Sequence, residues 1–301
     1  MIAWFLSYEN VIALILLNAI LGVAVYLMLS VNRFSLATGG LVALGAYISV
    51  LTTLHTTLPF PVALALGTAA GAGMALLLGL PVLKLEGDYF ALATLAFTEI
   101  VRVIAFNWDD VTGGALGLDG IPRNTSLGLL ASVLAILVAG VWWIRSSWIG
   151  RLLEATRQDE MPAQALGIDV ARVRLLTFVA SGAVCGLAGG LLGHLNFFIG
   201  PNDFGLLRSL DAVAYAILGG LNHVLGPVLG ALVFTVLPEA LRFSAQAREI
   251  ILSLILLLVV LFLPRGLLSL PILRLPAGRT RPLPSPSLRR IQADSAKGAA
   301  K

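Results

Sequence analysis

The stretch that decides the fold is RLLEATRQDEMPAQALGI, residues 151–168, which separates two long apolar runs. Its charged residues are Arg151, Glu154, Arg157, Asp159 and Glu160. Charged side chains at this density are too costly to place in the hydrocarbon of a bilayer. Pro162 suits the first turn of a helix, and Gly167 suits the position just past a helix end. We therefore predict two short helices outside the membrane, one running to about Glu160 and one from Pro162 to Leu166.

The composition of the chain is that of a membrane protein. Of its 301 residues, 58% are hydrophobic and only 12% are charged, whereas soluble domains carry about 25% charged residues. We predict an all-α, polytopic integral membrane protein, with about 8–10 transmembrane or re-entrant helices in residues 1–270. The apolar runs expected to form them are 11–30, 35–54, 62–83, 89–106, 126–144, 175–199, 206–221, 227–237 and 249–263. The two short runs, 206–221 and 227–237, either span the membrane or re-enter it.

Glycines recur at helical spacing in two of these runs. They are Gly67, Gly71 and Gly79 in one run and Gly182, Gly186 and Gly190 in the other. Small residues at such spacing let helix backbones approach closely inside membranes. We therefore expect these two runs to lie on interhelical contacts.

The distribution of Lys and Arg predicts the orientation in the membrane. Basic residues concentrate at Arg33, at Lys84, in the region 145–174 and after residue 264. Because cytoplasmic loops carry an excess of Lys and Arg, the loop 146–172 and the C-terminus are expected in the cytoplasm, with the N-terminus outside. Residues 271–301, rich in Pro and Arg, are expected to form a disordered basic cytoplasmic tail.

Ionisable residues inside the apolar runs are candidates for a translocation path. Glu99 and Arg102 lie three residues apart and can pair on one helix face. The pair either marks a pathway or is structural, near the outer membrane surface. Asp211 either caps a helix broken in the membrane or pairs with Arg208, and the pairing is favoured.

The segment 107–125 is a further candidate, because it is rich in Gly and Asp. Thr112, Gly113 and Gly114 open a glycine-rich run that extends to Pro122. Glycine lets backbone N–H and C=O groups come close to a ligand. An ordinary turn-rich loop is the alternative for this segment.

The stretch 151–168 resembles part of a known protein family. Its matching residues are Glu154-Ala155, Arg157, Asp159-Glu160 and Ala165-Leu166-Gly167-Ile168. They resemble the cytoplasmic loop of ABC-importer permeases, in the form found in branched-chain amino-acid permeases of the LivM type. The resemblance extends from about Ser35 to Leu267 and includes Glu99-Ile100-Val101-Arg102 and the Thr112-Gly113-Gly114 loop. Pro162 departs from the family pattern, where a small or aliphatic residue is expected.

The resemblance implies a permease subunit in the bacterial inner membrane. The loop 146–172 would dock on an ATPase subunit through Glu154, Ala155, Arg157, Asp159, Glu160, Leu166 and Gly167. The implied partners are two ATP-binding subunits, a second homologous permease subunit (LivH-like) and an extracytoplasmic substrate-binding protein. Branched-chain or related amino acids would be the substrate, and urea or short amides are an alternative.

The chain lacks the sequence marks of an enzyme. It has no G-x-x-x-x-G-K-[ST] loop, so ATP would be used by partner subunits and no cofactor is expected on this chain. The lone Cys185 and three dispersed His residues predict no metal site. A net charge of +4 does not suggest nucleic acid, and membrane lipid is the expected surrounding. The rivals from other classes are an ion-coupled secondary transporter and a membrane scaffold.

Overall fold

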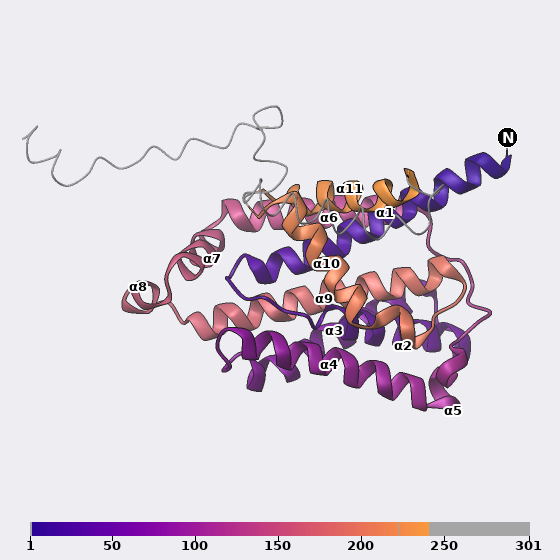
Figure 1. Ribbon diagram of the computed structural model, residues 1–301, viewed down its shortest axis with the longest axis horizontal. Coiled ribbons are helices and arrows are strands. Elements are labelled where there is room, and N and C mark those ends of the chain that lie inside the picture. The colour runs from indigo at the N-terminus through magenta and orange to yellow at the C-terminus, as the bar shows by residue number, and fades with distance from the viewer. Residues whose placement is uncertain (1, 222, 241–301) are drawn as a thin grey trace, which may run out of the picture. The chain divides into compact units, whose positions relative to one another are not determined.

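The computed structural model describes residues 2–221 and 223–240, and this part of the chain is helical apart from its connections (Figure 1). An antiparallel bridge joins Leu118 and Ile199. The α-helices are α1 (Ile2–Leu29), α2 (Thr38–His55), α3 (Phe60–Val82), α4 (Asp88–Asn107), α5 (Asp109–Thr112), α6 (Leu127–Ser146), α7 (Trp148–Gln158), α8 (Glu160–Ala165), α9 (Val170–Asn196), α10 (Leu206–Gly219) and α11 (Gly226–Ala240). Short 3₁₀ helices are η1 (Gly114–Leu116) and η2 (Pro201–Phe204). The predicted all-α fold is confirmed.

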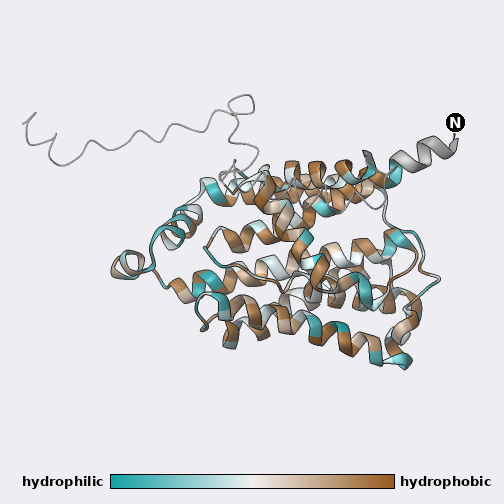
Figure 2. Cartoon of the chain, viewed as in Figure 1, coloured by the Kyte–Doolittle hydropathy of each residue, from teal (hydrophilic) through white to brown (hydrophobic). Residues whose placement is uncertain are grey.

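Six of the described helices are long and apolar enough to cross a membrane. They are α1 (from Glu9 onward), α2, α3, α4, α6 and α9, and their ribbons are mostly brown in Figure 2. Each corresponds to one of the predicted apolar runs, so the first six predicted spans are confirmed. The run 249–263 and the tail 271–301 lie outside the described residues.

The two ends of the bundle carry different connections. Helices α7 and α8 lie at one end, whereas α5 and the start of α1 lie at the opposite end (Figure 1). The Arg123 guanidinium donates to the Asn10 side chain at 3.2 Å, which joins the segment after α5 to the beginning of α1. The loop 151–168 and the start of α1 therefore lie at opposite ends of the bundle (Figure 1).

Helices α2, α3 and α9 pack at backbone contact through glycines. A Cβ atom placed on Gly45 of α2 would lie 2.2 Å from the carbonyl oxygen of Gly186 of α9. A Cβ atom on Gly71 of α3 would lie 2.4 Å from the carbonyl oxygen of Gly182 of α9. No larger side chain fits at these crossings, and the predicted close packing of the glycine-bearing runs is confirmed.

The short helices α10 and α11 form a unit that enters and leaves at the same end of the bundle. Helix α10 contains 14 residues, which at about 1.5 Å per residue is too short to span a hydrocarbon core of about 30 Å, and the described part of α11 contains 15 residues. Gly22 of α1 lies against Pro227, and Asn18 donates to Thr235 at 3.0 Å. Since α11 thus runs antiparallel to α1, it leads back toward the end where α1 begins. Re-entry, rather than two crossings, is the arrangement that the structure favours for these runs.

The boundary between the two short helices of the loop differs from the prediction. Helix α7 ends at Gln158 and α8 starts at Glu160, not at Pro162. The Asp159 carboxylate accepts the N–H of Met161 at 3.1 Å and so caps the start of α8. Pro162 remains within the first turn of α8, where its missing N–H costs nothing.

Candidate functional site

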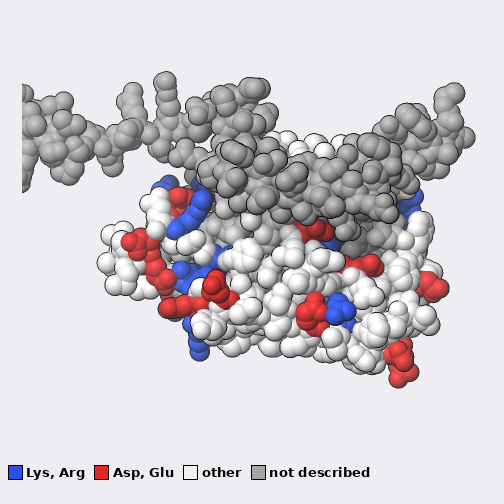
Figure 3. Space-filling view, viewed as in Figure 1, with Lys and Arg blue, Asp and Glu red and all other residues white. Residues whose placement is uncertain are grey.

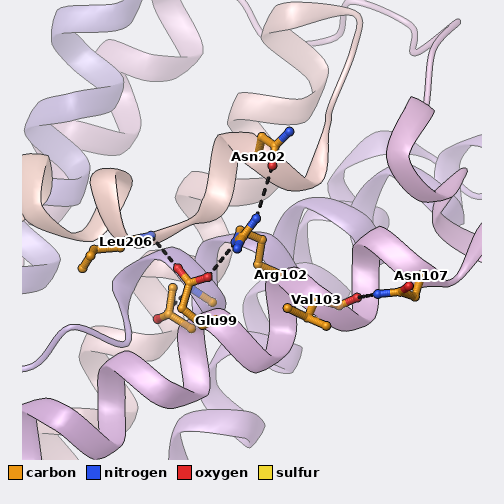
Figure 4. Close-up of polar contacts among 8 residues, drawn as sticks. Glu99, Arg102, Val103, Asn107, Asn202 and Leu206 are labelled. Atoms are coloured by element: carbon orange, nitrogen blue, oxygen red, sulfur yellow. Dashed lines mark hydrogen bonds and ion pairs between the residues drawn. The ribbon is translucent and has the colours of Figure 1, made fainter.

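Glu99 and Arg102 pair in the structure, and both hold the start of α10. The Arg102 Nε donates to Glu99 Oε2 at 2.7 Å, and the Leu206 N–H donates to Glu99 Oε1 at 3.0 Å (Figure 4). The Arg102 Nη1 also donates to Asn202 of η2 at 3.3 Å. Since Leu206 is the first residue of α10, the carboxylate lies at the positive end of that helix dipole.

The non-helical segment before α2 also contacts the middle of α4. Residues 31–37 are not helical, yet Ser35, Leu36 and Ala37 are buried. The Leu36 N–H donates to Thr94 at 3.0 Å, and the Thr98 hydroxyl donates to the Leu36 carbonyl at 2.7 Å. Irregular backbone inside a membrane bundle requires such internal partners, because hydrocarbon supplies none.

Ser209 joins the beginnings of α2 and α10. Its hydroxyl donates to the Leu36 carbonyl and accepts the Gly39 N–H, both at 2.9 Å. The first turns of two helices therefore meet beside the middle of α4. Discontinuous helices whose N-termini converge in this way hold substrates in several transporter folds, because their dipoles and backbone N–H groups favour anionic groups.

The Glu99–Arg102 pair is accessible rather than sealed in the core. Each side chain is 33% exposed, although α4 is long and apolar enough to cross a membrane. Polar residues within a span face protein or water and not lipid. The surface of α4 at this pair is therefore a protein-facing or water-facing surface in the membrane.

Asp211 lies within α10, and the described part of the structure does not contain the favoured ion pair with Arg208. Among the described residues no ion pair of 4 Å or less joins the two. The helix start that Asp211 was a candidate to cap is held by Glu99 instead. The Nε and Nη2 atoms of Arg208 are buried without a hydrogen-bond partner in this part of the chain.

The glycine-rich segment 107–125 contains a compact turn around Thr112. The buried Thr112 hydroxyl lies 2.6 Å from the Ala105 carbonyl and 2.8 Å from that of Trp108. Gly113 and Gly114 have φ values of +70° and +54°, which favour glycine. Thr112 and Gly114 are therefore committed to the loop itself, and the side chain left at the tip is Leu116, 86% exposed.

Ion pairs fix α7 and α8 at the opposite end of the bundle. Glu154 of α7 lies 3.6 Å from Arg145 of α6 and 4.0 Å from Arg157. Glu160 of α8 lies 2.7 Å from Arg174 of α9. Figure 3 shows basic and acidic side chains gathered over this end of the molecule. Each short helix is thus anchored to a long one by a charged pair.

The end of α8 has the geometry expected for Gly167. The Ile168 N–H donates to the Ala163 carbonyl at 3.1 Å, and the Gly167 N–H donates to that of Gln164 at 2.9 Å. These two bonds define a Schellman cap, with Gly167 at φ +82°. The predicted helix-terminating role of Gly167 is confirmed.

Two large apolar side chains at α8 are exposed in this chain, one within the helix and one at the residue that follows it. Met161 is 76% exposed and Leu166 is 80% exposed, whereas Ala163 is buried. Ala155 is half-buried, on the side of α7 where Thr156 is buried. Ala163 and Thr156 are therefore buried in this segment, whereas Met161 and Leu166 point away from the chain's own packing.

Several residues of these sites were not singled out from the sequence. They are Thr94, Thr98, Asn202, Ser209, Arg145 and Arg174. Thr94 and Thr98 carry a detectable signal, because hydroxyls four residues apart in an apolar run lie on one helix face. The partners of Arg145 and Arg174 depend on how α7 and α8 fold back, which no local pattern indicates.

Comparison with known proteins places these features in one family. Residues 7–263 match the family model described as branched-chain amino acid transport system / permease component. The chain is 30% identical to the high-affinity branched-chain amino acid transport system permease protein LivM of Salmonella typhimurium, over 88% of this chain and 69% of LivM. It is 34% identical to LivH of the same organism over 47% of this chain and 46% of LivH. The ribose import permease protein RbsC of Haemophilus influenzae is 28% identical over 85% of each chain.

Proposed function

This chain belongs to the branched-chain amino acid transport permease family, and on that premise we propose that it is the membrane permease subunit of an ABC importer. Its substrates are branched-chain or related amino acids, which it moves into the cytoplasm across the inner membrane. Separate subunits bind and hydrolyse ATP, and this chain carries no cofactor of its own. The family match carries the proposal, and the geometry of α8 supports the mode of energy coupling.

The α7–α8 segment is the proposed contact with the ATPase. Met161 of α8 and Leu166, the residue that follows it, expose apolar side chains. Helix α8 has six residues, and a helix this short is not stable alone in water. The Glu160–Arg174 pair, at 2.7 Å, links α8 to α9, which passes through the bundle. A displacement of α8 by the ATPase would therefore be transmitted to α9. Glu154, Arg157 and the cap at Asp159 hold this segment in shape.

The surface around Glu99 and Arg102 is the proposed wall of the translocation path. A substrate with an ammonium and a carboxylate has partners there in the Glu99 carboxylate and the Arg102 guanidinium. Both groups are partly exposed on the side of α4, which needs a protein or water neighbour. A second homologous permease subunit is the proposed neighbour, so that the path lies between two permeases.

The outer loop is proposed to meet the substrate-binding protein. Leu116 is the last residue of η1 and is 86% exposed, and η1 directly follows α5, which lies at the end of the bundle opposite α7 and α8 (Figure 1). In the proposed orientation this end and the N-terminus are outside, and α7, α8 and the C-terminus are in the cytoplasm. Thr112, Gly113 and Gly114 serve the path indirectly, by shaping the loop.

The test is uptake by the reconstituted complex. The chain is co-expressed with the partner genes and placed in liposomes that contain ATP. Labelled leucine, urea and acetamide are then offered together with the binding protein. We expect leucine uptake that requires internal ATP and survives the collapse of ion gradients. Preferred uptake of urea or acetamide would show that the substrates are urea or short amides and not branched-chain amino acids. Uptake driven by an ion gradient without ATP would overturn the proposal of an ABC importer.

A further inference from the structure

A cavity of about 410 Å³ lies at the end of the bundle that carries α8. Its walls are the end of α3, the connection from α3 to α4, helix α8 and the start of α9. The basic residues Arg33, Lys84, Arg172 and Arg174 line it, together with the acidic residues Glu86 and Glu160. Four cations thus face two carboxylates, and one of the four, Arg172, also pairs with Asp169 at 2.8 Å.

The positive charge of this cavity is only partly balanced by protein groups. Glu160 is held by Arg174 at 2.7 Å. Arg174 is 8% exposed, and its Nε is buried without a hydrogen-bond partner in the described part of the chain. Burial and the nearby positive charge of Arg174 lower the pKa of Arg33, against the opposing effect of Glu160 and Glu86. An anion in the cavity would give the Arg174 Nε a hydrogen-bond acceptor and would offset the positive charge around Arg33.

The other wall of the cavity is apolar and continues along the surface of α3. Leu80 lines the cavity and is 58% exposed, and Leu77, one helical turn earlier, is 69% exposed. Leu176 of α9 is also 69% exposed. These leucines belong to helices long and apolar enough to cross a membrane. The basic lining residues of the cavity therefore lie next to exposed leucines on helices that are apolar enough to contact lipid.

We propose that this cavity binds the headgroup phosphate of an anionic phospholipid, whose acyl chain lies along Leu80 and Leu77. Basic pockets between membrane helices on the cytoplasmic side suit such headgroups, since they offer charge and a neighbouring apolar path. A soluble phosphate shares the charge but makes no use of the leucines. The lipid would contact the residues that hold α8 in place, because Arg174 faces the cavity and also pairs with Glu160.

The test is lipid retention by the purified full-length chain. The chain is delipidated in detergent, mixed with equal amounts of phosphatidylglycerol and phosphatidylcholine, and its bound lipid is measured by native mass spectrometry. We expect selective retention of phosphatidylglycerol. The double variant Lys84→Gln/Arg172→Gln should bind it about thirty-fold more weakly. Each lost cation should cost about 1 kcal/mol of binding free energy, and about 2 kcal/mol corresponds to about thirty-fold in affinity. Lys84 is exposed and the Arg172 side chain is 82% exposed, so the variant should still fold.

Arg151→Gln is the matched control. Arg151 is an exposed basic residue of α7 that does not line the cavity, and its replacement should leave retention unchanged. Equal retention of the two lipids, or full phosphatidylglycerol retention by the double variant, would overturn the proposal. Glycerol 3-phosphate at millimolar concentration should not displace the lipid. Displacement at that concentration would assign the cavity to a soluble anion instead.

Discussion

The Glu99 carboxylate of α4 accepts the backbone N–H of Leu206 at 3.0 Å, so a side chain of one helix supports the first turn of another. The same carboxylate holds Arg102 at 2.7 Å. Helix α10 thus begins beside α4, and Glu99 satisfies one of its first N–H groups, which have no partner within their own helix. This contact joins the proposed translocation wall to the re-entrant α10–α11 unit.

Substitutions at Glu99 and Arg102 should be coupled. Glu99→Gln keeps an acceptor for Leu206 but loses the charge, and Arg102→Gln leaves a carboxylate without its cation. Because both side chains are a third exposed, we expect each single variant to lose about 1 kcal/mol of stability or less. The double variant should lose less than the sum in thermal unfolding. Strictly additive losses would exclude the coupling, and Asp110→Asn on α5, at an exposed position, is a control that should leave stability unchanged.

Gly167 should be replaceable only by residues that accept a left-handed conformation. A Cβ atom at Gly167 would meet nothing within 4 Å, so the cost of substitution comes from its φ of +82° alone. We expect Gly167→Leu to weaken ATPase retention, with about 1–2 kcal/mol of backbone strain. Gly167→Asn should retain most of the binding, because Asn tolerates this conformation. Co-purification of the ATPase subunits measures both, and equal retention by Leu and Asn variants would contradict the role of the cap.

The exposed apolar face of α8 should be needed for the ATPase and not for folding. Met161→Asp and Leu166→Asp replace side chains that are 76% and 80% exposed. We expect an unchanged melting temperature but at least tenfold weaker ATPase retention, since truncating an apolar anchor at an interface commonly costs 1–2 kcal/mol or more, about tenfold in affinity. Leu116→Asp at the other end of the bundle is the matched control. Normal ATPase retention by both α8 variants would remove this face from the interface.

The outer loop should depend on the Thr112 hydroxyl. Thr112→Val keeps the shape of the side chain but leaves the carbonyls of Ala105 and Trp108 without this donor. For a buried position we expect a loss of about 1–3 kcal/mol in the loop. Binding-protein-dependent uptake should fall while ATPase retention stays normal. Thr112→Ser, which keeps the hydroxyl, is the control, and equal uptake by the Val and Ser variants would show that the hydroxyl is dispensable.

Two glycines of α3 should respond in opposite ways to alanine. A Cβ atom on Gly71 would lie 2.4 Å from the Gly182 carbonyl oxygen, whereas one on Gly73 meets nothing within 4 Å. Gly71→Ala should force α3 and α9 apart and lower the yield and melting temperature of the chain. Gly73→Ala should be neutral or slightly stabilising, because alanine favours the helix by up to about 1 kcal/mol. Similar melting temperatures for the two variants would contradict backbone contact at Gly71.

Properties that depend on a single segment could be predicted from the sequence. Hydrophobic length and the exclusion of charge from hydrocarbon act on each run separately, so the six long helices and the polar α7–α8 segment were predicted correctly. The cap at Gly167 is likewise local, since it depends on the conformation of one residue. The Glu99–Arg102 pair was also predictable, because three residues on a helix bring two side chains to one face.

Properties that depend on contacts between distant segments were decided only by the tertiary structure. The sequence left open whether the runs 206–221 and 227–237 span the membrane or re-enter it, and the contacts of α11 with Gly22 and Asn18 of α1 favour re-entry. The support of Leu206 by Glu99 joins positions 107 residues apart. The role of Thr112 within its own loop, and the cavity between Lys84 and Arg174, also appear only when the helices are packed. The physical reason is that hydrogen bonds and charge balance inside the bundle depend on which helix is the neighbour, and local sequence patterns do not specify neighbours.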